Sequence, residues 1–158
     1  MIPDKHFKAL RILVDRLSNK KIAWAIVGGT NFALQGVDVK AKDIDVLTDK
    51  EGAFAIGEAL KEFAVQPVKY SENERFNCYH GKFKIEGIDI EVMGEIENKI
   101  PVGDLWTETK GFSEKIFIEY KGLRIPVISL KQEYYAYTMM GKTEKAKKIK
   151  EVLDKKIA

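Results

Sequence analysis

Apolar residues recur at helical spacing near both ends of the chain. Within residues 4–19 they lie three or four positions apart with charges between them, which predicts an amphipathic helix that covers a sheet. Ser129, with Gln132 three residues later, has the form of a capping box and predicts a helix that runs to about Met140. A final Lys-rich helix is predicted to follow, with an apolar face formed by Ala146, Ile149, Val152, Leu153 and Ile157.

Shorter apolar runs between these helices predict strands. Residues 22–27 form a continuous apolar run, typical of a strand that is buried on both faces. Residues 43–47 alternate between polar and apolar positions, like a half-buried strand. Apolar runs on both sides of Glu86-Gly87 and of Lys121-Gly122 predict two hairpins, because such dipeptides suit tight turns.

Two further helices are predicted directly after strands. A glycine turn at Gly28-Gly29 leads into a short helix over residues 30–35. Thr48, with Glu51 three residues later, has the form of another capping box and opens a helix with the apolar stripe Phe54, Ile56, Ala59, Leu60 and Phe63. Without a repeat or a linker in the sequence, we predict a single α+β domain over residues 1–158.

Composition narrows the class of protein. With 158 residues, 45% hydrophobic and 32% charged, the chain is too apolar for a disordered protein and has enough apolar residues for one core. Its apolar runs fall far short of the roughly 20 residues of a membrane-spanning helix, so no membrane partner is expected. A single cysteine and the absence of a signal-peptide pattern predict a cytoplasmic protein. Abundant Lys and Glu with few Asn and Gln lean towards a heat-adapted source.

The strongest chemical signal is a pair of carboxylates on the predicted strand at 43–47. Asp43 and Asp45 are two residues apart, so their side chains leave the same face of the strand. Adjacent carboxylates repel each other unless a cation neutralises them. Oxygen ligands without accompanying His or Cys favour Mg²⁺ or Mn²⁺ over zinc. The pair therefore predicts a divalent metal site.

A second pair with the same spacing, Asp89 and Glu91, lies on a later predicted strand. If that strand lies beside the first, one of its acids could supply a third ligand and allow two ions about 3.5–4 Å apart. An exposed hairpin also alternates charged and apolar residues, so the sequence leaves both interpretations open.

The glycine pair precedes a predicted helix N-terminus, where free N–H groups bind phosphate well. Thr30 adds a hydroxyl donor. Gly28 and Gly29 alone would more often be a simple turn, but the acids shortly downstream could hold a triphosphate from its other side. The combination predicts a phosphate cradle beside a metal site.

These motifs resemble the signature of a known superfamily. Val27-Gly28-Gly29-Thr30, followed by Asp43-Ile44-Asp45-Val46 and a later strand acid, is similar to the DNA polymerase beta-like nucleotidyltransferases. Within this superfamily, the chain is similar to the small stand-alone bacterial and archaeal members. These are related to lincosamide nucleotidyltransferases and to abortive-infection nucleotidyltransferase toxins. The motif core spans about residues 22–93, with looser similarity in a C-terminal helical part at about 129–158. The resemblance implies a nucleotidyltransferase fold: a mixed central sheet flanked by helices, with C-terminal helices.

The resemblance also assigns roles to the motif residues. It implies that Gly28, Gly29 and Thr30 contact the nucleotide phosphates, and that Asp43 and Asp45 coordinate magnesium. Many relatives carry an Arg and a Thr shortly before the acidic pair. This chain has lysines there instead, so positive charge towards the triphosphate would come from Lys40 and Lys42.

A third acid completes the implied site. Glu91 is favoured as catalytic residue and metal ligand, because relatives carry an acid followed by apolar residues at this place; Asp89 remains its rival. In such enzymes an acceptor hydroxyl attacks the α-phosphate of a nucleoside triphosphate, pyrophosphate leaves, and the third acid assists deprotonation of the nucleophile.

The resulting hypothesis is a magnesium-dependent nucleotidyltransferase that transfers a nucleoside monophosphate to an acceptor hydroxyl. The acceptor is left open between a small molecule, the 3′ end of a tRNA and a protein side chain, and a homo-oligomer could complete the cleft. The alternative is a catalytically weak nucleotide-binding or protein-interaction module of the same fold. A third possibility is an RNA-binding module that acts through the C-terminal lysines.

Other chemically active residues are interpreted as structural. His6 and His80 have no partner at the sequence spacing of a metal or base site. Cys78 is interpreted as a small buried hydrophobe. Tyr134, Tyr135 and Tyr137 could stack on a nucleobase, but aromatic residues on a late helix are mostly core.

Overall fold

The computed structural model describes residues 2–74, 76–99, 106–108 and 115–157. In these residues the helices are α1 (Asp4–Leu17), α2 (Gly28–Leu34), α3 (Lys50–Ala59), the 3₁₀ helix η1 (Lys61–Phe63), α4 (Leu130–Met139) and α5 (Thr143–Ile157). The strands are β1 (Trp24–Val27), β2 (Ile44–Thr48), β3 (Ala64–Glu72), β4 (Phe76–Ile85), β5 (Ile88–Lys99), β6 (Trp106–Glu108), β7 (Lys115–Tyr120) and β8 (Leu123–Ile128).

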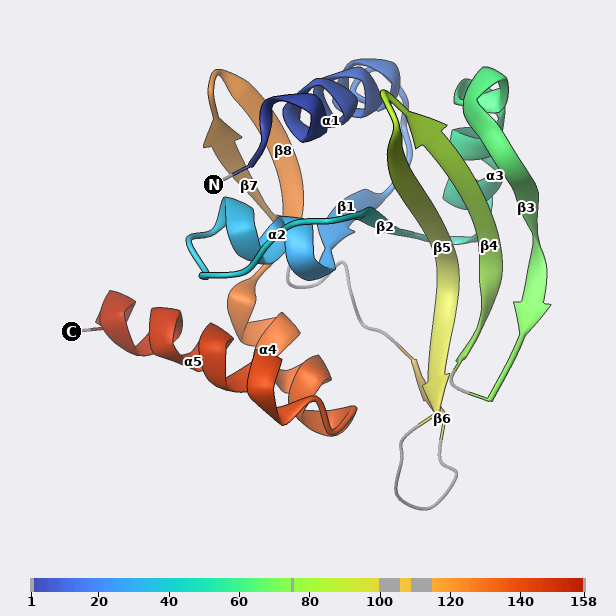
Figure 1. Cartoon of the computed structure of the whole chain (residues 1–158). Coiled ribbons are helices and arrows are strands. Elements are labelled where there is room, and N and C mark those ends of the chain that lie inside the picture. The colour runs from blue at the N-terminus through green and yellow to red at the C-terminus, as the bar shows by residue number, and fades with distance from the viewer. Residues whose placement is uncertain (1, 75, 100–105, 109–114, 158) are drawn as a thin grey trace.

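A mixed sheet runs through the middle of the structure (Figure 1). Its strand order is β3-β4-β5-β2-β1-β8-β7, and the short strand β6 pairs with β5 outside this path. The β1–β2 pair is antiparallel, whereas β2 pairs with β5 and β1 with β8 in parallel. The prediction of an α+β fold with a mixed central sheet is confirmed.

The larger hydrophobic core lies between the sheet and the helices α1 and α3. The apolar face of α1 contributes Leu10, Leu13 and Leu17, all fully buried, and Ile44 and Val46 of β2 point into the same cluster. An amphipathic helix on a sheet face is the arrangement that the N-terminal periodicity predicts.

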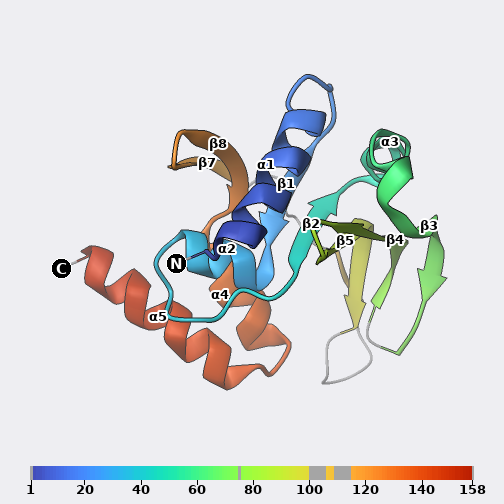
Figure 2. The same ribbon diagram turned by 45° about the horizontal axis from the view of Figure 1, so that its top comes forward.

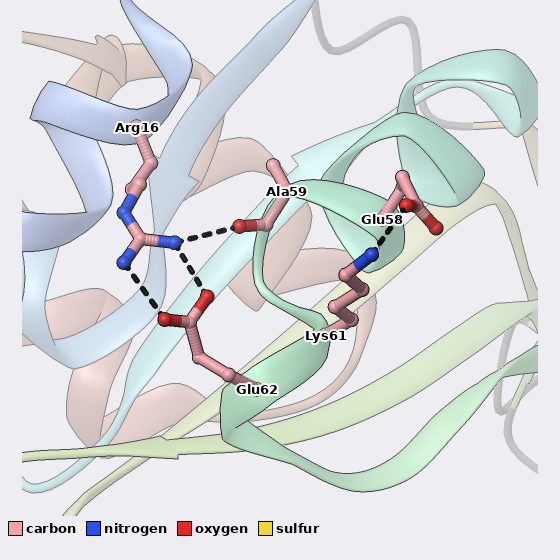
Figure 3. Close-up of polar contacts among 5 residues, drawn as sticks. All are labelled: Arg16, Glu58, Ala59, Lys61 and Glu62. Carbon is pink, nitrogen blue, oxygen red and sulfur yellow. Dashed lines mark hydrogen bonds and ion pairs between the residues drawn. The ribbon is translucent and has the colours of Figure 1, made fainter.

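A polar clamp joins α1 to the end of α3. The Arg16 guanidinium donates to the Ala59 carbonyl oxygen at 2.9 Å and forms two hydrogen bonds with the Glu62 carboxylate, at 2.7 and 3.1 Å (Figure 3). Lys61 and Glu58 form a second, exposed ion pair beside it. Arg16 thus satisfies a carbonyl at the C-terminus of α3, where the helix leaves such groups without partners.

Helix α2 lies between α1 on one side and α4 and α5 on the other (Figures 1 and 2). Phe32 of α2, Leu130 of α4 and Ile149 of α5 share one buried cluster. The two C-terminal helices therefore pack against the segment that carries the glycine motif. Of the predicted apolar face of α5, Ala146 and Ile149 are buried, and Val152 and Leu153 pack partly buried against this cluster. The side chain of Ile157 lies outside the described residues.

Both predicted hairpins are confirmed, as β4–β5 and β7–β8. Their two-residue turns have positive φ at both positions: 52° and 76° at Glu86 and Gly87, and 50° and 79° at Lys121 and Gly122. This is the backbone that matches the twist of the strands, and glycine adopts it without strain.

Two local predictions need correction, and one strand was not predicted. The glycines do not form a separate turn before a helix at residue 30, because α2 begins at Gly28 itself. The N-cap of α3 is Asp49, which accepts from the Gly52 N–H at 2.6 Å, whereas the Thr48 hydroxyl donates to the Ala23 carbonyl. Strand β3, on the edge of the sheet, had no prediction because its polar residues follow no simple alternation.

Within the described residues, no helix is both long and apolar enough to cross a membrane. Cys78 is fully buried in a small cluster on the sheet face opposite α1, and burial raises the pKa of its thiol to about 11. Its interpretation as a buried hydrophobe is confirmed.

Candidate functional site

The two carboxylate motifs meet on neighbouring strands. β2 lies between β1 and β5, and Asp45 is paired in register with Glu91 on one side and with Val27 on the other. Asp43 lies just before the first residue of β2. The condition for a third acid, that the two acidic strands lie side by side, is thereby met.

A pocket of about 510 Å³ opens over the β2 acids. Its lining comes from the glycine motif, the loop before β2, the acids themselves and the two C-terminal helices: Gly29, Val39, Lys40, Lys42, Asp43, Asp45, Tyr137, Lys142, Glu144, Lys145 and Lys148. Five lysines against three carboxylates give the lining a positive balance. A lining with this positive balance attracts a polyanion, and the acids Asp43 and Asp45 belong to the same lining.

Asp45 has the most perturbed carboxyl group of the acidic pairs. Burial, followed by the negative charges of Glu91 and then Asp43, raises its pKa to about 7, although Lys142 and Lys145 act in the opposite direction. The ionised form of Asp45 is therefore costly in this structure, and a positive charge placed beside it would be stabilised.

The two acids of β5 have different surroundings. Asp89 is exposed near the hairpin turn, with its carboxylate 3.5 Å from the Lys84 ammonium. Glu91 is opposite Asp45 and bonded to His80 Nε2 at 3.0 Å, and this bond lowers the pKa of Glu91. Of the two rivals for the third acid, Glu91 is the one that the strand register places next to Asp45.

The two glycines of the motif, Gly28 and Gly29, also have different surroundings. The Gly28 N–H does not face the pocket: it donates to Glu133 Oε2 of α4 at 2.8 Å. Gly28 also has a φ of 75°, and a Cβ there would lie 2.8 Å from Asp45 Oδ2. Gly29 lines the pocket, and a Cβ there would meet nothing within 4 Å. The N–H at the first residue of α2 is thus engaged within the protein.

The Thr30 hydroxyl is also engaged. The side chain is fully buried, and its Oγ1 donates to the Asp43 carbonyl oxygen at 2.6 Å and lies 2.9 Å from His6 Nε2. Burial lowers the pKa of His6, which favours the neutral ring. In this structure Thr30 ties the α2 helix to the start of the acidic strand.

Several site residues escaped the sequence analysis. His6 and His80 are both buried, and the fold brings to them Thr30 and Glu91, partners that the sequence spacing did not indicate. Glu133, buried beneath the glycine motif, gave no signal beyond an acid on an amphipathic helix. Of the three tyrosines, Tyr137 lines the pocket, whereas Tyr135 is exposed and not core.

From the sequence, Lys145 and Lys148 are considered only as part of the C-terminal lysines of a possible RNA-binding surface, and not as residues of the nucleotide site. Together with Lys142 they are spaced three residues apart, which places all three on one stripe of α5 or at its start. That stripe faces the acids across the pocket. The spacing was readable in the sequence, but nothing there showed which part of the protein it would face.

Carboxylate oxygens are the donors available for a cation at this site. Among residues 2–74, 76–99, 106–108 and 115–157, no three His, Cys, Asp or Glu side chains are grouped closely enough to form a ready-made metal cluster. Two acids, Asp43 and Asp45, line the same pocket, and Glu91 is the strand neighbour of Asp45.

Comparison with known proteins supplies the family. The family model of the aminoglycoside-2″-adenylyltransferases matches residues 9–153. The solved structure of TM1012, a proposed nucleotidyltransferase from Thermotoga maritima, is 38% identical with a TM-score of 0.83, and the match covers 98% of this chain and 96% of that one. A search of the curated proteins found no match.

Two more distant structures agree in fold. The lincomycin-bound lincosamide antibiotic adenylyltransferase LnuA has 16% identity and a TM-score of 0.58, over 96% of this chain and 98% of that one. ANT(2″)-Ia, in complex with adenylyl-2″-tobramycin, has 10% identity and a TM-score of 0.53, over 82% and 72%. The chain therefore has the nucleotidyltransferase fold, and it belongs to the aminoglycoside-2″-adenylyltransferase family.

Proposed function

We propose that this protein is a magnesium-dependent nucleotidyltransferase, which transfers the nucleoside monophosphate of a nucleoside triphosphate to an acceptor hydroxyl and releases pyrophosphate. One observation carries the proposal. Asp43 and Asp45 lie in a pocket whose other charged groups are mostly lysines, so carboxylates for a metal and cations for a triphosphate face the same space.

The donor set fits a hard divalent cation, Mg²⁺ or Mn²⁺. It consists of carboxylate oxygens, and Asp45 has a pKa raised to about 7 by burial and negative neighbours, a penalty that a bound cation would relieve. Asp43 and Asp45 would hold the ion, with Glu91 as the proposed third acid. When bound, the metal would supply charge stabilisation at the α-phosphate.

The chain's own cations would hold the triphosphate. Lys40 and Lys42 reach the pocket from the loop before β2, and Lys142, Lys145 and Lys148 reach it from the C-terminal helices. Charge-assisted contacts to phosphate oxygens are stronger than neutral ones and fix the α-phosphate near the acids. Gly29 lines the pocket between these groups and allows a phosphate close to the backbone. Phosphate contacts from Gly28 and Thr30 belong to the same proposal, although both groups have internal partners in this structure.

Glu91 is proposed as the group that takes the acceptor proton. Its bond to His80 orients the carboxylate, and its lowered pKa keeps it ionised and able to accept. In the reaction the hydroxyl oxygen bonds to the α-phosphorus, its proton passes to Glu91, and the bond from the α-phosphorus to the bridging oxygen of pyrophosphate breaks.

The relatives suggest which substrates to try first. The matched family is one of adenylyltransferases, and LnuA and ANT(2″)-Ia were solved with an antibiotic or its adenylyl derivative. We therefore propose ATP as the donor and a hydroxyl of a small molecule as the acceptor, ahead of a tRNA 3′ end or a protein side chain. The cytoplasmic location and the heat-adapted source stay predictions from composition.

The test is calorimetric titration of each of the four NTPs, with and without MgCl₂, into the wild type and into Asp43→Asn/Asp45→Asn. We expect ATP binding that requires Mg²⁺ and is weakened at least about 100-fold in the variant, because each lost carboxylate removes a metal ligand. Asp89→Asn is the control: it removes one carboxylate on a neighbouring strand, outside the pocket.

Each contrary result has a defined meaning. Folded wild type that binds none of the four NTPs would contradict the proposal. Equal NTP binding by wild type and double variant would favour the non-catalytic module, because that function does not need the metal ligands. Binding of RNA without any NTP requirement, and with steep salt dependence, would favour the RNA-binding module.

A further inference from the structure

Glu133 is a buried acid that touches the glycine motif from a distant part of the sequence. It lies in the first turn of α4, where its side chain is 5% exposed. Its Oε2 atom accepts two hydrogen bonds from α2: from the Gly28 N–H at 2.8 Å and from Asn31 Nδ2 at 3.0 Å. The reaction proposed above gives this carboxylate no role.

A carboxyl group so deeply buried needs a reason. Acids are almost never fully buried unless they are paired, because loss of hydration is costly. Within the described residues Glu133 forms no ion pair; its two donors are a backbone amide and a side-chain amide. An apolar residue, like its helix neighbour Leu130, would fill this place at lower cost. The polar contacts to α2 are what the acid adds.

These contacts belong to a network across three elements. Asn31 Nδ2 also donates to the Ile128 carbonyl oxygen at the end of β8, at 2.8 Å. Gln35 donates to Asn31 Oδ1 at 2.6 Å and to the same carbonyl at 3.0 Å. Glu133 therefore locks α2 against β8 and α4 together, rather than through a single bond.

The network lies directly behind the proposed nucleotide pocket. Gly28, held by Glu133, is so close to Asp45 that a Cβ on it would lie 2.8 Å from the Asp45 carboxylate. One turn after Glu133 on α4, Tyr137 lines the pocket, and the loop that follows carries Lys142. The hydrogen bond between Gly28 and Glu133 thus constrains both the backbone beside Asp45 and helix α4, which leads to the lysines of the pocket.

We propose that Glu133 is a positioning residue for the nucleotide site: it fixes the Gly28 amide and the first turn of α2 against Asp45, and it docks α4 so that Tyr137 and the α5 lysines face the acids. The proposal rests on the function proposed above. It adds a residue that touches neither metal nor nucleotide and that sets the distance between the two walls of the pocket.

Two substitutions at this position and one control separate positioning from packing. Glu133→Met keeps a long, unbranched helical side chain but removes the carboxylate acceptor. Glu133→Gln restores a carbonyl oxygen that can accept from Gly28 and Asn31. Leu130→Ala damages packing in the same helical turn and leaves the Glu133 acceptors in place.

The measurements are the hydrogen exchange rate of the Gly28 amide by NMR, and the dissociation constant of ATP with MgCl₂ by calorimetry. In Glu133→Met we expect Gly28 exchange to be about ten-fold faster and ATP binding about ten-fold weaker, because the Gly28 and Asn31 donors lose their buried acceptor. Glu133→Gln should restore both to within about three-fold. Leu130→Ala should lower the melting temperature and leave Gly28 exchange close to that of the wild type.

Three results would overturn the proposal: unchanged Gly28 exchange or ATP binding in Glu133→Met, an equal opening of Gly28 in Leu130→Ala, or a folded Glu133→Gln that loses Gly28 protection. The last also decides the matter if Glu133→Met does not fold. Wild type that fails to bind ATP would refute the proposed function, and the exchange rates would then decide the role of Glu133 separately.

Discussion

The two carboxylate pairs have the same spacing and lie on neighbouring parallel strands, yet their surroundings differ. Asp43 and Asp45 face a pocket walled by lysines, and the Asp45 carboxyl has a pKa raised to about 7. On β5, Asp89 is exposed beside Lys84, and Glu91 has its pKa lowered by His80. A spacing of two residues places acids on one face of a strand, but the neighbouring elements decide what each acid can do.

The difference has a physical cause. β2 is an inner strand between β1 and β5, so Asp45 loses water to neighbours on both sides, whereas Asp43, just before the strand, is exposed. β5 begins at a hairpin turn, so Asp89 stays in water at the end of the strand while Glu91, two residues further in, reaches the site. Position along the strand thus separates two acids that the sequence presents as equivalent.

The largest expected effect separates the two acids of β5. Glu91→Gln should lower the rate of nucleotidyl transfer about 100-fold or more, the usual effect of losing a general base. Asp89→Asn should leave it within about two-fold, because that side chain is exposed and pairs with Lys84. Pyrophosphate release in the presence of ATP and an accepted acceptor measures both. The reverse order would make Asp89 the third acid.

Stability against pH tests the contrast between Asp45 and Glu91. The folded-state pKa of Asp45, about 7, is above its ordinary value of 3.8, so the folded protein binds the extra proton. The free energy of unfolding should therefore fall as pH rises from about 4 to 7, by at most about 4 kcal/mol at 1.36 kcal/mol per pKa unit. Glu91, whose pKa is lowered, contributes the opposite slope in the acid range.

Urea unfolding of wild type and Asp45→Asn at several pH values measures this slope. In the variant, the contribution of Asp45 to the pH dependence of the free energy of unfolding should be lost. A contribution of the same sign from Glu133 should stay, because burial also raises the pKa of Glu133 to about 7. Identical slopes in the two proteins would mean that the pKa of Asp45 is not raised in the folded protein. MgCl₂ should stabilise the wild type above pH 7 and have little effect on the variant.

Crowding around Asp45 predicts a difference between the two glycines. Gly28→Ala should lower the free energy of unfolding by about 2 kcal/mol or more, because φ is 75° and the new Cβ would crowd the Asp45 carboxylate. Gly29→Ala should change it by less than about 0.5 kcal/mol, since the Cβ would point into open space. Denaturant unfolding compares them, and equal losses would refute a specific contact at Gly28.

The smallest effect is expected at His80. His80→Ala leaves Glu91 in place but removes its bond, so we expect about a three- to ten-fold loss of transfer rate, from the loss of one oriented hydrogen bond. The dissociation constant of ATP should change little, because His80 is not part of the pocket lining. A loss as large as that of Glu91→Gln would instead make His80 part of the proton transfer itself.

Much of this protein could be predicted locally. The periodicity of α1, the Ser129 cap of α4, the two glycine hairpins and the acidic strand depend on neighbours within a few residues, and the structure has them where they were expected. The errors were also local: the cap of α3 lies one residue later than its capping-box pattern indicates, because Thr48 continues the strand.

The sequence by itself determined that acids two apart would share a face, that a helix would follow the first strand near the glycine pair, and that lysines would gather near the C-terminus. Only the tertiary structure decided which groups meet. Glu133 reaches Gly28 across 105 positions of sequence, and His80 and Glu91 pair across a hairpin. Such contacts depend on strand order and helix docking, and no local pattern encodes them, because side-chain periodicity fixes a direction and not the partner found there.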